Sequence, residues 1–188
     1  AKTTVTDCSL EDNESGNGFG GGIYSFRSYL DIDDSEIIGS TAMKGGGLSF
    51  HEGRLDMNSC RVNQNEAAGA GEGGGLYLFL TDTSVFNSTI QYNLANWSGG
   101  AAYISGDPNS LDVPIETIFK NCLITDNTAR RDGAGISNNW DAETELYNCT
   151  IYKNIVTGSE LDNDFGGGIY SSYGGKVKVK DSIIRKNV

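Results

Sequence analysis

The feature that most constrains the fold of this chain is a repeat that occurs six times and starts a seventh. Each copy reads apolar-x-apolar-x-(Asp/Asn)-(Cys/Ser)-x-apolar-x-x-Asn-x-Ala, and a Gly-rich triplet follows after a gap of variable length. Self-similarity at a period of about 20 to 50 residues is the signature of a solenoid, in which stacked repeats bury one continuous core. The Cys/Ser position is occupied by Cys8, Ser35, Cys60, Ser88, Cys122, Cys149 and Ser182.

Within each repeat, apolar and polar residues alternate in short runs, as β-strands require. No segment sustains the apolar spacing of a helix, so we expect almost no α-helix. Three runs recur: an entering run such as Leu30-x-Ile32, the Cys/Ser-x-apolar pair, and Gly-apolar-Tyr. The alternation slips between the first two runs at a polar residue, which indicates a corner, since Asn and Asp tolerate the left-handed region. The corner residues are Asp7, Asp34, Ser59, Asn87, Asn121, Asn148 and Asp181.

These patterns predict an all-β fold, a right-handed parallel β-helix of about six to seven coils with three short strands per coil. The whole chain, residues 1–188, is expected to form a single β-helix domain. The Asn position of the repeat predicts a buried ladder of amides that bond from coil to coil, with Ser40 as its weak rung. The four cysteines fall in one repeat position and are interpreted as small buried side chains that alternate with Ser.

The net charge of the chain limits the partners that such a β-helix can bind. With 14 basic and 25 acidic residues the formal net charge is −11, which argues against nucleic acid or an anionic membrane as partner. No apolar stretch approaches the ~20 residues that span a bilayer, so this segment is not expected to insert into a membrane. Glycans or cell-surface proteins remain as partners. Strands at both ends would leave open edges, which favours a fragment of a longer surface protein or end-to-end self-association.

The repeat also resembles a known one. The pairs Val62…Asn65, Ile90…Asn93 and Ile124…Asn127, each followed by Ala and then by a Gly-rich triplet, are similar to the units of the polymorphic outer-membrane proteins of the chlamydial type. That resemblance spans the chain. It implies a surface-displayed adhesin with a β-helical passenger, and therefore an extracellular or cell-surface location.

An acidic cluster supports a different class of function. Asp31 and Asp56 occupy the same outward position of adjacent coils, which is unfavourable unless a cation intervenes. Asp31, Asp33 and Asp56 are therefore candidate Ca²⁺ ligands. Arg61 would then hold a uronate or serve as a base, with Asp33 and Arg61 as candidate catalytic residues of a Ca²⁺-dependent polysaccharide lyase or epimerase. The alternative is a solvated cluster that arginines neutralise.

A column of tyrosines follows the glycine triplets. Tyr24, Tyr77, Tyr103 and Tyr170 are expected to point outward, with Ser49 and Ser137 interrupting the column. Aromatic side chains stacked along a β-helix either bind sugar rings or stabilise the sheet by cross-strand packing. The first interpretation makes the four tyrosines candidate ligand-binding residues.

Length variation is confined to segments that must bulge from the surface, where function tends to reside. They are Asn13–Phe19, Ala68–Glu72, Gly106–Pro114, Asn138–Glu143 and Thr157–Phe165. The sequence thus favours a non-catalytic extracellular or cell-surface module, a structural stalk or adhesin. The Ca²⁺-dependent lyase or epimerase is the alternative.

Overall fold

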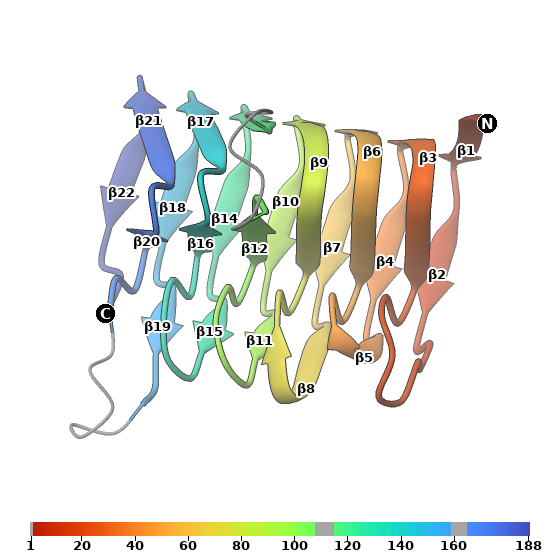
Figure 1. Cartoon of the computed structure of the whole chain (residues 1–188), viewed down its shortest axis with the longest axis horizontal. Helices are drawn as coiled ribbons and strands as arrows, with labels where there is room; N and C mark the ends of the chain where they lie inside the picture. Colours follow the sequence, from red (N-terminus) through yellow and green to blue (C-terminus); the bar gives the residue numbers. More distant parts are fainter. Residues whose placement is uncertain (1, 108–114, 159–164) are drawn as a thin grey trace.

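In the computed structural model, the described residues 2–107, 115–158 and 165–188 wind into a parallel β-helix (Figure 1). Every pair of strands in them is parallel, each strand pairs with its counterpart in the neighbouring coil, and these residues contain no helix. Figure 1 shows the strands stepping in order along the long axis, from the N-terminal β1 to the C-terminal coil with β20, β21 and β22. The predicted β-helix with three strands per coil is confirmed.

The largest sheet, sheet A, holds ten strands within the described ranges. Its strands are β1 (Lys2–Thr6), β3 (Ile23–Asp33), β6 (Leu48–Asn58), β9 (Leu76–Phe86), β12 (Ala102–Ser105), β13 (Glu116–Lys120), β16 (Ile136–Asn139), β17 (Glu143–Tyr147), β20 (Ile169–Ser172) and β21 (Lys176–Lys180). The strands β3, β6 and β9 each join the Gly-apolar-Tyr run of one coil to the entering run of the next. Later coils divide this strand into two.

The two other sheets are built from short strands. Sheet B has seven in the described part of the chain: β2 (Ser9–Glu11), β4 (Glu36–Ile38), β7 (Arg61–Asn63), β10 (Thr89–Gln91), β14 (Leu123–Thr125), β18 (Thr150–Tyr152) and β22 (Ile183–Arg185). Sheet C follows the Asn position and contains β5 (Thr41–Lys44), β8 (Glu66–Glu72), β11 (Leu94–Ala95), β15 (Thr128–Ala129) and β19 (Ile155–Val156).

Left-handed residues turn the chain between sheets. All seven predicted corner residues have positive φ, from 46° at Asp34 to 56° at Asn121. The first glycine of each triplet also has positive φ, for example 65° at Gly45, where an added Cβ would lie 2.3 Å from the Leu48 carbonyl oxygen. The second and third glycines face other backbone, since a Cβ on Gly47 would lie 2.8 Å from the Gly75 oxygen of the next coil. Turning requires glycine at the first position, whereas close stacking of coils limits the second and third positions to small residues, Gly or, at Ala134 and Ala101, Ala.

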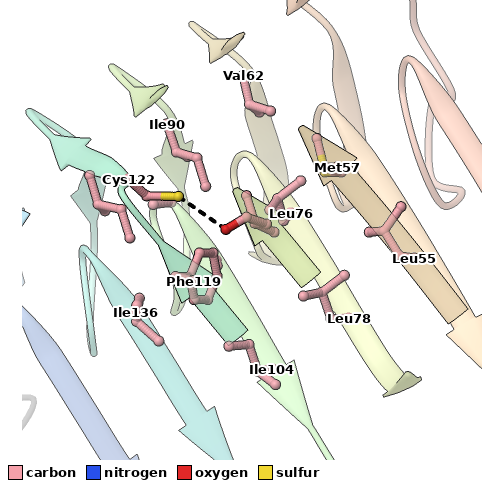
Figure 2. Close-up of a cluster of buried hydrophobic side chains, with 14 of the residues drawn as sticks. Leu55, Met57, Val62, Leu76, Leu78, Ile90, Ile104, Phe119, Cys122 and Ile136 are labelled. Carbon is pink, nitrogen blue, oxygen red and sulfur yellow. Dashed lines mark hydrogen bonds between the residues drawn. The ribbon is translucent and has the colours of Figure 1, made fainter. Parts of the chain in front are cut away.

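Inward residues of all three sheets fill one apolar core. In the middle coils Leu55, Met57, Leu76 and Leu78 are buried to 1% exposure or less. Figure 2 shows these side chains converging with those of neighbouring coils, among them the Cys122 sulfur. The four cysteines are free thiols, and Cys60, Cys122 and Cys149 are buried as expected, whereas Cys8 is exposed.

A ladder of buried amides runs along the core, as predicted. Side-chain amides of consecutive coils bond in the order Asn65, Asn93, Asn127, Asn154 and Asn187, with Nδ2–Oδ1 distances of 2.9 to 3.0 Å. Each of these amides also donates to a backbone carbonyl of the preceding coil, as Asn65 does to Ile37 at 2.9 Å. Ser40 takes the Asn position with a hydroxyl, which accepts the Asn13 backbone N–H at 3.3 Å, while its own backbone N–H donates to Asn65 Oδ1 at 2.9 Å. The ladder satisfies polar groups that are costly to bury unpaired.

Candidate functional site: an aromatic face with one open gap

The tyrosine column lies on the outer face of sheet A, in the strand segments that directly follow the glycine triplets. Register places Tyr24 beside Ser49, Ser49 beside Tyr77, and Tyr77 beside Tyr103. Ser137 then separates Tyr103 from Tyr170. The Tyr77 and Tyr103 rings are stacked, with centroids 5.4 Å apart and planes 1° apart. The four tyrosines therefore form one column with two serine gaps, as the sequence predicts.

Aromatic side chains fill the first gap, at Ser49. The His51 ring lies 5.4 Å from both Tyr24 and Tyr77, and its Nε2 is 3.1 Å from the Ser49 Oγ. Phe19 packs on His51 at 4.6 Å. Rings from neighbouring columns thus restore the contact that the missing tyrosine would have made.

The second gap, at Ser137, is a hollow of about 130 Å³. Tyr103 and Tyr170 lie on its two sides along the column, and Trp97, Trp140 and Tyr173 also line it. Trp140 and Tyr173 stack on each other with centroids 4.1 Å apart and planes 7° apart. Aromatic surfaces therefore border the hollow on several sides.

Hydrogen-bonding groups line the same hollow. Asn139 Nδ2 donates to the Ser137 Oγ at 3.0 Å, and the Ser172 hydroxyl donates to Asn139 Oδ1 at 2.6 Å. Ser98 and Asp132 also contribute, with the Ser98 hydroxyl donating to Asp132 Oδ2 at 3.2 Å. Most of the surface that faces the hollow is therefore polar, with aromatic rings at its sides. Polar groups that converge in this way can fix the orientation of a small ligand.

The charges around the hollow are largely matched. Arg131 stacks over the Trp97 ring at 4.8 Å, with its Nε 3.7 Å from Asp132 Oδ2. Glu72 lies 3.0 Å from Lys44 Nζ. Burial, with a smaller effect of the Glu72 charge, raises the pKa of the Tyr103 hydroxyl well above its ordinary value. Tyr103 is therefore neutral and able to donate a hydrogen bond at physiological pH.

The acidic cluster lies elsewhere on sheet A, near the N-terminal end. Asp31 and Asp56 are direct register partners, as predicted. Lys2 Nζ is 2.7 Å from Asp31 Oδ2, while Arg54 Nε is 3.0 Å from Asp56 Oδ2. Partial burial opposes ionisation of Asp56, but bonds from Arg54 and Tyr29 outweigh it and keep its pKa below the usual value. Protein cations thus neutralise both carboxylates.

The two other members of the cluster have different neighbours. Asp33 pairs in register with Asn58, two residues along β3 from Asp31. Arg61 lies in sheet B and donates from Nη2 to Glu36 Oε2 at 2.8 Å. Among the described residues, no group of three or more His, Cys, Asp or Glu side chains is arranged to hold a metal ion. The Ca²⁺ ligands and the catalytic pair Asp33 and Arg61 stay predictions.

Sequence reasoning identified Tyr103, Tyr170 and the serine gap at Ser137 but not the other aromatic residues of the hollow. Tyr103 and Tyr170 were singled out, whereas Trp97, Trp140 and Tyr173 were not. Two signals point to them in retrospect. Trp97 lies two residues before the first glycine of a triplet, and Trp140 lies in the predicted insertion Asn138–Glu143.

In a comparison with known proteins, no family model, curated protein or solved structure matches the chain. In the described part of the chain, no helix is long and apolar enough to cross a membrane.

Proposed function

We propose that this chain is a non-catalytic β-helix module of an extracellular or cell-surface protein, acting as an adhesin or stalk that binds glycans on its aromatic face. The observation that carries the proposal is the hollow at Ser137, bordered by Tyr103, Tyr170 and Trp140 and lined with hydroxyl, amide and carboxylate groups. Pyranose rings present C–H faces to aromatic side chains and hydroxyls to polar ones.

The scaffold suits such a role mechanically. Strand pairs join every coil to the next, and the amide ladder adds bonds through the interior. A column held in this way keeps its outer face rigid, so a ligand site on it needs little ordering on binding. The surface location is supported by the resemblance of the repeat to surface-displayed adhesins.

A glycan-array experiment tests the proposal. The chain is applied to immobilised neutral, amino and uronate oligosaccharides beside the double variant Tyr103→Ser/Tyr170→Ser, which uses the residue that the column itself carries at two positions. We expect the wild type to bind and the double variant to lose about tenfold or more in affinity, since each aromatic contact contributes about 0.5–1.5 kcal/mol. Tyr92→Asn is the control, because Tyr92 is an exposed aromatic residue outside this face. Binding that the double variant retains in full would contradict the proposal.

The Ca²⁺-dependent lyase or epimerase is the second candidate, favoured by the register pairing of Asp31 and Asp56. Calorimetric titration with Ca²⁺ and incubation with uronate polymers test it. If the chain is such an enzyme, Ca²⁺ gives a binding heat that Asp56→Asn removes. The uronate polymers then yield unsaturated or epimerised products, and Arg61→Ala abolishes their formation. The adhesive proposal requires that the polymers stay intact.

A further inference from the structure

The two serine gaps in the tyrosine column have the same repeat framework. Ser49 lies between Tyr24 and Tyr77, and Ser137 lies between Tyr103 and Tyr170. Each serine hydroxyl also bonds the residue two positions along the same strand, His51 in the first case and Asn139 in the second. The gaps therefore differ in what fills them and not in backbone register.

The residues that fill the first gap have small polar counterparts at the second. His51 corresponds to Asn139, and Phe19, which precedes a glycine triplet in the coil before, corresponds to Ser98. Two rings are thereby replaced by an amide and a hydroxyl. The rings that close the first gap have no equivalents at Ser137, where a hollow of about 130 Å³ remains.

The spacing of the coils limits the thickness of a ring that could fit between Tyr103 and Tyr170. Two steps of about 4.8 Å separate the strands that carry Tyr103 and Tyr170, roughly 9.6 Å in total. A ring between two parallel aromatic rings needs about 3.5–4.0 Å on each side at van der Waals contact. The remaining distance of about 1.6–2.6 Å suits a puckered ring better than a flat one. A single pyranose in its chair form meets this condition.

The lining favours a neutral sugar over a uronate. Two carboxylates, those of Glu72 and Asp132, border the hollow, and the nearby cations already interact with them, Lys44 with Glu72 and Arg131 with Asp132. A uronate would bring a third carboxylate beside them, whereas the hydroxyls of a neutral sugar would donate to these oxygens and accept from Ser137.

We propose that the Ser137 gap is a binding subsite for one neutral pyranose, which stacks between Tyr103 and Tyr170 in the place of the missing tyrosine. This inference rests on the proposed glycan-binding function and makes it specific. The sugar lies with its two C–H faces toward the tyrosine rings. Its equatorial hydroxyls meet Ser98, Asn139 and the carboxylates at the edge.

Tryptophan fluorescence reports on this subsite directly. The chain has two tryptophans, Trp97 and Trp140, and both line the hollow. We expect titration with neutral methyl pyranosides and short neutral oligosaccharides to change the emission in a saturable way. The matching uronates are expected to bind at least about tenfold more weakly, because an unfavourable contact of 1.4 kcal/mol corresponds to that factor.

Two variants fill the gap in different ways. Ser137→Tyr continues the column with its own residue type, and Ser98→Phe/Asn139→His transfers the side chains that close the first gap. Each is expected to weaken neutral-sugar binding at least about tenfold. Thermal unfolding shows whether each variant keeps the fold, and two independent fillings keep the test informative if one fails to fold. Tyr92→Asn, outside the face, is expected to bind as the wild type does.

The outcomes separate this inference from the function on which it rests. Glycan-array binding that both filled variants retain within twofold leaves an adhesive module but overturns the Ser137 subsite. Stronger binding of uronates than of neutral sugars overturns the ligand class. Failure of the wild type to bind any saccharide, on the array and in solution, overturns the proposed function itself.

Discussion

The Asn93 side-chain amide donates to Oδ1 of Asn127 in the next coil across 2.9 Å, and the same oxygen accepts the Asn93 backbone N–H at 3.0 Å. One buried oxygen thus serves two donors of the neighbouring coil. The Asn127 Nδ2 in turn donates to the Ile90 carbonyl and to Asn154 Oδ1. Each interior amide joins three coils, and this arrangement makes the ladder a test of what holds the column together.

Replacing Asn127 by Asp should destabilise the fold strongly. The change keeps the shape of the side chain, but it removes the donor to the Ile90 and Thr125 carbonyls and to Asn154 Oδ1, and it places a charged oxygen against these three acceptors. Leaving buried groups unpaired and burying a charge both cost free energy, so we expect the free energy of unfolding to fall by about 3 kcal/mol. Urea denaturation at pH 7 measures it.

Asn121→Asp is the matched control. Asn121 belongs to an exposed ladder in which its Nδ2 donates to Asn87 Oδ1 at 3.0 Å and its Oδ1 accepts from Asn148 at 2.9 Å. Asp tolerates the positive φ at this corner as well as Asn does. Water can solvate the new carboxylate, so a loss below about 1 kcal/mol is expected. Equal losses in the two variants would show that burial does not give the interior ladder its importance.

Replacing Ser40 by Asn, which extends the amide ladder to this coil, should stabilise the fold. Asn65 Oδ1 accepts the Ser40 backbone N–H at 2.9 Å, but Ser40 provides no side-chain amide to match those of the other coils. In Ser40→Asn the new amide can donate to Asn65 Oδ1 and to the Leu10 carbonyl. We expect a gain of about 1 kcal/mol and a rise in Tm of about 2–4 °C by calorimetry.

The control for this gain is the same substitution at another buried serine. Ser35 lies outside the ladder, and its hydroxyl accepts from the Cys8 N–H at 3.1 Å and donates to the Asp33 carbonyl at 2.7 Å. Ser35→Asn adds volume to a filled site and should lower Tm. A Tm for Ser40→Asn no higher than that of the wild type would refute the predicted gain.

His51 should titrate below its ordinary pKa of 6.5. Burial lowers the pKa of its imidazole, Lys44 adds to the effect, and Glu52 opposes it. Because the unfolded chain binds this proton more readily, the stability linked to His51 is full above pH 6.5. It declines as the pH falls from 6.5 through the folded-state pKa.

A single imidazole signal makes this measurable by NMR, since the chain contains one histidine. Lys44→Met should move the midpoint up toward 6.5, and Glu52→Gln should move it further down. Movement of both variants in the same direction would contradict the electrostatic explanation. Urea titrations at several pH values then relate the midpoint to stability.

The periodicity of the sequence was sufficient to predict the coil, its corners and both the Asn and the Tyr columns. When repeats stack as coils, residues at the same repeat position lie above one another. It was insufficient for sheet C. Strands such as Leu94–Ala95 are two residues long, and alternation cannot be recognised over two residues. The joining of two runs in β3, β6 and β9 was also missed, since the left-handed residues Arg27, Glu52 and Leu80 bend these strands without ending them.

The candidate site was only half predictable for a related reason. Tyr103 and Tyr170 belong to the repeat, so their column follows from counting residues. The hollow depends on departures from the repeat: Ser98 in place of Phe19, Asn139 in place of His51, and Trp140 from an insertion. Whether a gap is filled therefore depends on side chains at three different repeat positions, those of Ser98, Asn139 and Trp140. The position of Arg61, in contact with Glu36 across sheet B, likewise follows from pairing between coils.

Thiol reactivity provides a test of the core itself. Cys60, Cys122 and Cys149 are 1–4% exposed, and Cys60 and Cys122 donate to carbonyl oxygens of the preceding coil. Burial raises the pKa of Cys60, while the neighbouring Cys149 thiol and burial raise that of Cys122. Because the thiolate is the reactive form, both location and pKa slow the reactions of Cys60 and Cys122. The hydrogen bond from the Cys122 thiol lowers the pKa of Cys149 to about 7, so burial alone, at 1% exposure, protects Cys149. A disulfide-exchange reagent at pH 8 should therefore titrate one thiol rapidly, that of Cys8. Cys8→Ser should remove the rapid phase, and denaturant should make the other three reactive together. A second rapid thiol in the native protein would mean that the coils do not stack as described.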